Sequence, residues 1–418
     1  MHNLKIWNYL SIPWLVFTLT FFVVFFLLAF LVEVDSSYLS RNYLNKLFLN
    51  TIILSFGSAI LSAIIAVPLA ILVTFYKFPG HKFFSWSLSL SIAFPAYVYA
   101  FIYVGIFEYA SPVSEYLRNF NITLPQIKNI YGASLIMAMA LFPYIFLLTK
   151  AHLGSVGIKV FKAAKSLGDT NITAIRKVII PSLWPTIIAG MALVIFETIA
   201  DFGGVSTLRV DTFTVGIYDA WFGYQSYFSA TRLAGFLLLF VFLIMFLAKY
   251  FGEKSVHLAS KTAETFERIE TTPIVRIGML IFCSLIFIIV FCIPTTQLIV
   301  WNLADSNLNL ISNLQLLINS LIVGLLASVI TVFFAIALAL SYKHSNILKS
   351  SILISSSGYA IPGSVISAGL LVGIDYIFDT SITFYGILGL LMCLSLRFMT
   401  PAFNYISASL SNISKSAE

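Results

Sequence analysis

Apolar residues dominate this chain in long runs, and short polar stretches separate one run from the next. Most runs reach about twenty residues, the length that an α-helix needs to cross a hydrocarbon core of about 30 Å. Ten such spans are predicted, at residues 11–32, 48–76, 83–107, 131–149, 183–200, 232–251, 277–301, 315–342, 351–374 and 385–404. The pattern predicts an all-α integral membrane protein that crosses the lipid bilayer about ten times.

Composition agrees with a membrane protein. The mean hydropathy is +0.97, and 10% of the residues are charged, whereas soluble domains carry about 25%. The net charge of +7 therefore gives no reason to expect a nucleic-acid partner. Cys283, Cys292 and Cys393 lie inside apolar runs, where we expect buried apolar side chains and no disulfide or metal site.

Lysine and arginine are unevenly divided between the two sides of the predicted spans. With the N-terminus inside, 17 of the 24 fall on the cytoplasmic side, the side where positive charge accumulates in multi-pass proteins. The first apolar run is too long for a signal peptide and lacks a small-residue cleavage site, so we expect an anchor. The sequence predicts a multi-pass membrane protein with a cytoplasmic N-terminus.

The chain also repeats itself, with an offset of 269 residues at the first matched pair and 254 residues at the last. The repeat is marked by LNT at 49–51 and INS at 318–320, by FPA at 94–96 and IPG at 361–363, and by YG at 131–132 and 385–386. Pro95 and Pro362 fall inside predicted spans, where we expect kinks packed against other helices. A packing role and a gating role remain open for both. The pattern predicts two tandem copies in the same orientation.

One polar stretch, Lys162–Pro181, lies between the fourth and fifth predicted spans, on the cytoplasmic side. Its first half has helix-forming composition, with small Ala163 and Ala164 where a partner could approach closely. Gly168 follows, and glycine ends helices at little steric cost because it adopts positive φ. We therefore expect a turn at Gly168 after a short helix.

The second half of the stretch predicts another short helix. Asp169, Thr170 and Asn171 offer N-cap oxygens, and the helix should place Ile172, Ile175 and Ile179 on one face and Arg176 with Lys177 on the other. We expect Pro181 to end it, because proline lacks an N–H group and clashes with the preceding turn. The whole is a predicted helix–turn–helix at the membrane surface.

This stretch resembles the coupling loop of ATP-binding-cassette (ABC) permeases, whose pattern is E-A-A, three residues, G, nine residues and I-x-L-P. Ala163, Ala164 and Gly168 match, and Val178, Ile180 and Pro181 follow at the right spacing. Lys162 stands where the family usually has glutamate. An ordinary basic loop is the alternative. The resemblance implies a permease subunit of a bacterial inner membrane. Its loop would bind an ATPase in the cytoplasm, and its outer loops would receive a periplasmic solute-binding protein.

The chain shows no catalytic site of its own. It has no G-x-x-x-x-G-K-[ST] loop, so any ATP is expected on a separate subunit. HExxH, CxxC and GxSxG motifs are also absent. We expect a protein that is not an enzyme and holds no cofactor or metal.

Two carboxylates lie in or near the fifth predicted span. Glu197 and Asp201 are four residues apart, on one face of a helix. An acidic side chain at this depth usually faces a water-filled path or a cation, and a structural role for Glu197 is equally compatible. Asp201 is nearer the surface and more typical of a helix end before Gly203 and Gly204.

The segment DFGGVST at 201–207, with TVGIY at 214–218, AWF at 220–222 and the duplicated unit, resembles ferric-iron permeases. That resemblance covers residues from about 48 onward and implies ferric iron as cargo, delivered by a periplasmic binding protein. Fused thiamine permeases share the layout, so thiamine or another small solute is an alternative. A secondary transporter with Glu197 as the titrating group is a further one.

The predicted organisation follows from the repeat. We expect an anchor helix and outer loop at 1–46, a first ABC type-1 transmembrane domain with its coupling loop at 47–251, a cytoplasmic linker at 252–276, a second anchor helix at 277–314 and a second transmembrane domain at 315–418. Residues Ile413–Glu418 look like the start of a second coupling loop. We therefore expect the second copy to be truncated.

Overall fold

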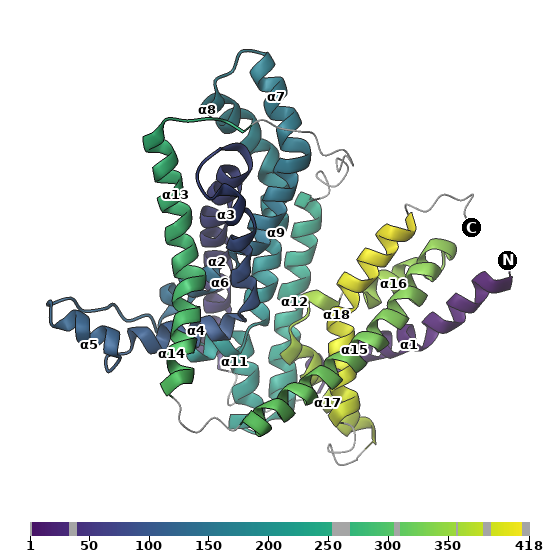
Figure 1. The fold of residues 1–418 in the computed structure, drawn as a ribbon. Coiled ribbons are helices and arrows are strands. Elements are labelled where there is room, and N and C mark those ends of the chain that lie inside the picture. Colours follow the sequence, from purple (N-terminus) through teal and green to yellow (C-terminus); the bar gives the residue numbers. More distant parts are fainter. Residues whose placement is uncertain are drawn as a thin grey trace. The chain divides into compact units, whose positions relative to one another are not determined.

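The structure is a computed structural model that describes residues 2–32, 40–252, 268–304, 310–356, 358–378 and 386–411. In these ranges the regular elements are helices, apart from an isolated bridge between Tyr76 and Ile269. Eight helical stretches in the described ranges are long and apolar enough to cross a membrane, and a bent helix pair is a ninth candidate. The predicted all-α membrane fold is confirmed, with fewer straight spans than the ten expected (Figure 1).

The third predicted span, 83–107, is wrong as a straight helix. It consists of α3 (His81–Ser87), a 3₁₀ turn and α4 (Ala96–Phe107), and the chain bends by 89° at the break. Phe94 is extended, with ψ of 123°, because the ring of Pro95 disfavours the helical region for the residue before it. The length of the apolar run predicted one straight crossing, whereas Pro95 bends the chain in the middle of the run.

The ninth predicted span, 351–374, is interrupted in the same way. It consists of α16 (Lys349–Ser355), a 3₁₀ turn at Gly358–Ala360 and α17 (Gly363–Phe378). Neither helix reaches the length of a membrane crossing. The break lies just before Pro362, the residue that precedes α17. The prediction of one continuous span is therefore also wrong.

The chain forms two compact units, each built from separated segments. Residues 45–215 and 242–306 form one, here called the α6 unit, and residues 1–44, 216–241 and 307–418 form the other, the α15 unit. The predicted domains are consecutive along the chain, whereas each of these units combines residue ranges that are separated in the sequence. The α6 unit includes the predicted second anchor helix, and the α15 unit includes the predicted first one.

The α6 unit holds the helices around the polar stretch. Besides α3 and α4 it contains most of α2 (Arg41–Phe75), with α5 (Pro112–Arg118), α6 (Ile130–His152), α7 (Ile158–Ser166), α8 (Asn171–Ala174), α9 (Ile180–Ala200), α10 (Gly203–Thr207), part of α11 (Phe213–Tyr218), α13 (Pro273–Phe287) and α14 (Ile293–Ala304). Helix α6 is the centre of the unit, since it packs on α9, α4 and α10.

Helices α6 and α9 approach each other closely at Gly190. A Cβ atom there would lie 3.1 Å from the Cα atom of Ile145, which is tighter than an ordinary contact, so a larger residue would require the two helices to shift slightly. Large apolar side chains fill the rest of the α6 surface, with Met137, Phe142 and Phe146 fully buried. Association of helices in lipid depends on such close packing, which makes this pair the rigid element of the unit.

The α13–α14 pair packs on α3 and α4. Its two helices meet in a π-helical turn, Ile288–Cys292, and a π turn leaves carbonyl groups out of the regular helical pattern. Two tyrosines of α4 fill this need: the Tyr99 hydroxyl donates to the Val290 carbonyl and the Tyr103 hydroxyl to the Ile289 carbonyl. The contact satisfies backbone polar groups that lipid could not.

The α15 unit is built on α1 (His2–Phe30), α15 (Leu310–His344) and α18 (Gly386–Ser411), with α16, α17 and most of α12 (Tyr227–Gly252). Helix α1 packs on α15, α16 and α17. The Thr18 and Ser355 hydroxyls lie 2.6 Å apart, and Trp14 stacks on Phe334 at 5.1 Å. At the end of α1, Arg232 donates to the carbonyls of Ala29 and Val32, as basic side chains often do at helix C-termini.

The two units contain helices in a matching order. Helices α2 and α15 each have 35 residues, and α3 and α16 each have seven. A 3₁₀ turn, a proline and a further helix follow in both series. Helix α15 begins 269 residues after α2, and α16 begins 268 residues after α3.

The linker between the predicted copies is only partly described. Residues 253–267 lie outside the described ranges, as do Ile413–Glu418. From Arg268 the chain runs beside the end of α2, where the Ile269 N–H donates to the Phe75 carbonyl and the Lys77 N–H donates to the Ile269 carbonyl. Lys77 also pairs with Glu270 at 2.7 Å, which ties the start of α13 to this end of the unit.

Candidate functional site

The polar stretch forms the predicted helix–turn–helix at one end of the α6 unit (Figure 1). Helix α6 passes through a π turn, Leu153–Gly157, into α7. The chain then turns, forms α8 and passes through a second π turn, Ile175–Ile179, into α9. Two helices that leave and re-enter the membrane side by side thus carry the loop.

Gly168 makes the turn, as predicted. Its φ is +92°, the Gly168 N–H donates to the Lys165 carbonyl and the Asp169 N–H donates to the Ala164 carbonyl. This is the Schellman pattern that closes a helix with a left-handed residue. The Thr170 hydroxyl then caps α8 by accepting from the Thr173 N–H at 3.2 Å. Of the three predicted cap residues, Thr170 is therefore the N-cap.

The two small residues of α7 face different ways. Ala164 is 5% exposed, and beside it Phe161 packs on Phe75 with ring centroids 5.1 Å apart. Ala163 is exposed. Ala164 therefore fixes the loop to the unit, whereas Ala163 is available to a partner.

The outer surface of the loop combines positive charge with exposed apolar side chains. Leu167 and Ile172 are 88% and 75% exposed, and Lys162 is also exposed. The expectation that Ile172 and Ile179 lie on one face is wrong, since Ile172 is exposed and Ile179 is fully buried. The π turn between them shifts the helical period, because it adds a residue to the turn.

Pro181 does not end a helix. It lies at the start of α9, which continues to Ala200, and Val178, Ile180 and Pro181 form the passage from the loop into the membrane. Proline is tolerated in a first helical turn, where its missing N–H is not needed. The π turn directly before α9 supplies this setting, which the sequence pattern alone did not reveal.

The base of the loop is fastened to neighbouring helices. His152 at the end of α6 is half-buried, and its Nδ1 atom lies 3.1 Å from the Thr186 hydroxyl of α9. The Lys150 ammonium donates to the Ser85 carbonyl in α3. A movement of the loop would therefore be transmitted to α3, α6 and α9 together.

Glu197 and Asp201 lie at the far end of α9. Glu197 is half-buried in its last turn. Asp201 leaves the helix with ψ of 120°, so helical periodicity no longer sets its direction, and its Oδ1 atom accepts from the Gly204 and Val205 N–H groups at 2.7 and 3.2 Å. The Asp201 side chain therefore holds the start of α10.

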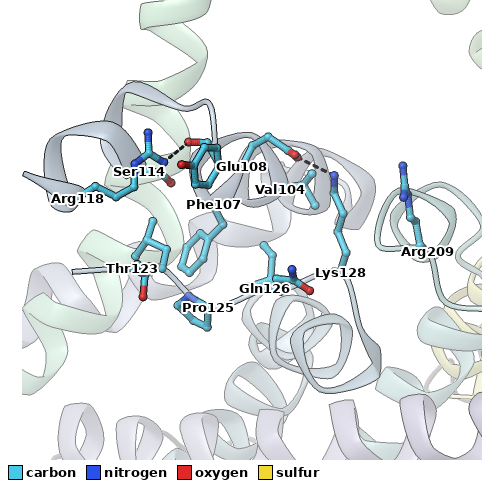
Figure 2. Close-up of a pocket in the computed structure, with 13 residues that line it drawn as sticks. Val104, Phe107, Glu108, Ser114, Arg118, Thr123, Pro125, Gln126, Lys128 and Arg209 are labelled. Atoms are coloured by element: carbon cyan, nitrogen blue, oxygen red, sulfur yellow. Dashed lines mark hydrogen bonds and ion pairs between the residues drawn. The ribbon is translucent and has the colours of Figure 1, made fainter. Parts of the chain in front are cut away.

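A cavity that sequence reasoning missed lies at this same end of the unit. It measures about 460 Å³ and is lined by α4, α5, the segment before α6, and Arg209 after α10. Figure 2 shows Arg118 at one end, Arg209 at the other, and Lys128 paired with Glu108 between them. The only sequence signal was that Arg118, Lys128 and Arg209 fall among the few basic residues on the predicted outer side.

Comparison with known proteins finds a family similarity over part of the chain. Residues 66–256 match the family described as the binding-protein-dependent transport system inner membrane component. The match contains both ends of the α6–α9 pair, including the helix–turn–helix and the cavity.

Two relatives are informative. Sulfate transport system permease protein CysT of Salmonella typhimurium is 27% identical over 155 residues, which are 37% of this chain and 55% of that protein. Fe(3+)-transport system permease protein FbpB 2 of Haemophilus influenzae is 25% identical over 391 residues, 91% of this chain and 73% of that protein. The chain thus spans about half the length of the sulfate permease it matches.

Proposed function

We propose that this chain, whose residues 66–256 carry a permease domain of the binding-protein-dependent transport family, is the membrane subunit of an ABC importer. The observation that carries the proposal is the family match across a helix–turn–helix with an exposed, basic and apolar surface. In this proposal the loop Lys162–Pro181 is cytoplasmic and binds a separate ATPase, with Ala163, Leu167 and Ile172 at the contact. ATP hydrolysis belongs to that partner, and a periplasmic binding protein delivers cargo.

We further propose that the chain contains two copies of one permease unit, with the N-terminus in the cytoplasm. The 269-residue offset, the equal lengths of α2 and α15, and the equal lengths of α3 and α16 support this. In this arrangement the anchor helix of each copy packs on the helices of the other, α1 on α15 and α13–α14 on α4.

Ferric iron is the proposed cargo. The supporting observation is the extent of the similarity to an Fe(3+) permease, 391 aligned residues. Sulfate is the second candidate, because the sulfate permease has slightly higher identity over a shorter segment. Thiamine or another small solute remains an alternative on layout alone. Glu197 is the proposed acidic group of the path, and Asp201 positions α10 beside it.

Co-purification tests the proposed subunit role. A tagged chain should retain its ATPase, and Ala163→Glu should weaken retention because it places a carboxylate in the contact. Ala304→Glu adds the same side chain at an exposed position at the end of α14 and should leave retention unchanged. If the wild-type chain retains no ATPase, or Ala163→Glu retains as much as wild type, the loop is not the docking site.

Transport into proteoliposomes tests the energy source and cargo. Uptake of labelled ferric iron should require ATP, the ATPase and the binding protein. Uptake driven by an ion gradient alone would instead identify a secondary transporter. Labelled sulfate, offered under the same conditions, separates the two cargoes, and uptake of sulfate without iron would overturn the iron proposal while keeping the importer.

A further inference from the structure

We propose that the cavity between α4, α5, the segment before α6, and Arg209 is a binding site for a sulfate- or phosphate-type oxyanion. Its position on the outer side of the membrane rests on the proposed function. Its binding chemistry does not, because that follows from the charges and backbone geometry around the cavity.

The cavity and the loop Lys162–Pro181 lie at opposite ends of the same two helices. Lys128 lies just before α6, and the loop follows that helix's 23 residues. Helix α9 runs back from the loop over 21 residues to the segment that carries Arg209. At 1.5 Å per residue, each helix spans about 30 Å, the thickness of the hydrocarbon core. The cavity therefore opens at the membrane surface opposite the loop.

The charges around the cavity favour an anion. Three basic side chains, Arg118, Lys128 and Arg209, line it with one carboxylate, Glu108. Lys128 lies 2.7 Å from Glu108, which uses one of its three donors. Arg118 donates to the Tyr109 carbonyl and stacks on the Tyr109 ring at 3.9 Å, which holds the guanidinium in place and leaves other N–H groups available. The four side chains together carry an excess of positive charge.

Arg209 is held in a backbone conformation that arginine does not favour. Its φ is +56°. The Arg209 N–H donates to the Ser206 carbonyl and the Val210 N–H donates to the Val205 carbonyl, which is the Schellman pattern at the end of α10. Glycine is the usual residue at this position, because a Cβ atom adds steric strain. Strained residues of this kind are found preferentially at functional sites.

The Arg209 side chain lies beyond ion-pair distance of the carboxylates in the described residues, and its charge interacts with Glu108 at longer range. It is exposed and lies at the cavity edge beyond Lys128 (Figure 2). A guanidinium group offers planar, paired N–H donors that match two oxygens of a tetrahedral oxyanion, and it is weakly hydrated compared with an ammonium group. Arg209 is therefore the principal proposed ligand, and Lys128 the second.

The same phosphate chemistry has two possible sources, a free oxyanion in water or the headgroup of an anionic lipid. The free source is tested by equilibrium binding of radiolabelled inorganic sulfate, and separately phosphate, to the full chain in neutral detergent. Chloride at matched ionic strength controls for screening. The lipid source is tested by thermal unfolding in phosphatidylcholine vesicles with and without phosphatidylglycerol.

Arg209→Gly is the decisive variant, because it removes the guanidinium and relieves the positive φ. It should weaken sulfate or phosphate binding at least tenfold without loss of folded protein. Asn121→Gly is the matched control: Asn121 has φ of +58° in the same hydrogen-bond pattern after α5 but carries no charge, so binding should be unchanged. Glu108→Gln should strengthen binding, since it removes the competing carboxylate.

The outcomes separate cleanly. Binding of the free anion that Arg209→Gly abolishes supports a site for dissolved oxyanions. Stabilisation by phosphatidylglycerol that Arg209→Gly abolishes, without free-anion binding, supports a headgroup site. Binding of neither, or binding unaffected by Arg209→Gly, overturns the proposal. None of these measurements requires an ATPase or transport, so failure of the site and failure of the importer role are distinguishable.

Discussion

The turns at Gly168 and Arg209 share one backbone conformation but place very different residues in it. Both close a short helix with the same pair of hydrogen bonds and a positive φ, +92° at Gly168 and +56° at Arg209. The first lies at the loop end of the α6–α9 pair and the second at the cavity end. The loop end uses the residue with the least steric cost, whereas the cavity end uses a long cationic side chain.

The difference separates two kinds of requirement. At Gly168 a Cβ atom would meet no other atom within 4 Å, so the backbone alone requires glycine, and the shape of the loop is what matters. At Arg209, as at Gln225 with φ of +52°, the backbone would also favour glycine, and the arginine places a cation at the edge of the cavity. Asn121, in the same pattern, is intermediate, because asparagine tolerates positive φ better than arginine.

The largest effect is expected from a charge at the buried side of the loop. Ala164→Asp places a carboxylate at a 5% exposed position against Phe161, and burial of an unpaired charge should destabilise the loop by about 3 kcal/mol. Hydrogen exchange in α7 and ATPase retention report it. Ala163→Asp is the control one residue away, and it should lower retention without raising exchange. Equal exchange in both variants would contradict the assigned faces.

Gly168→Val should have the next largest effect. A β-branched side chain at φ of +92° should cost about 2 kcal/mol, with no steric clash to add to it. Gly168→Asn should cost less, since asparagine visits this region. Thermal unfolding and ATPase retention are the measurements, and a valine variant as stable as the asparagine variant would show that the turn relaxes.

Arg209→Gly should show the opposite sign. Relief of the positive φ is partly offset by the greater freedom of glycine in the unfolded chain, so stability should stay within about 1 kcal/mol of wild type, on the stable side. Thermal unfolding without added oxyanion checks this. A clear loss of stability would mean that the arginine side chain holds the fold, and the contrast with Gly168 would fail.

The smallest effect concerns pH at the loop end. The hydrogen bond from Lys77, followed by the Lys77 charge, lowers the pKa of Glu270 below its usual 4.5. A lowered pKa contributes stability that is fully present above the unfolded value, and it is lost as pH falls through the folded one. Glu270→Gln should therefore reduce thermal stability slightly at pH 7, and this difference should disappear as the pH falls below the lowered pKa of Glu270. Lys77→Met combined with Glu270→Gln should show the same pH dependence as Glu270→Gln alone.

Much of the membrane architecture could be predicted from the sequence. Long apolar runs predicted the helices because no other structure satisfies backbone groups within lipid. Gly168 predicted its own turn, because the spacing of small and polar residues around it is local information. Pro181 misled for the opposite reason: a proline signals a break, and whether it ends one helix or starts the next depends on the turn before it.

Tertiary structure decided the rest. Arg118, Lys128 and Arg209 are up to 91 residues apart in the chain, and the bend at Pro95 together with the α6–α9 packing gathers them around one cavity. The sequence did not mark Arg209 as a residue of positive φ, because glycine is the usual residue at this position of a Schellman turn. The sequence by itself determined most of the long apolar helices and where the loop turns, but not the breaks within 83–107 and 351–374. Only the packing of distant helices determined which side chains meet, because those contacts join residues that no local pattern connects.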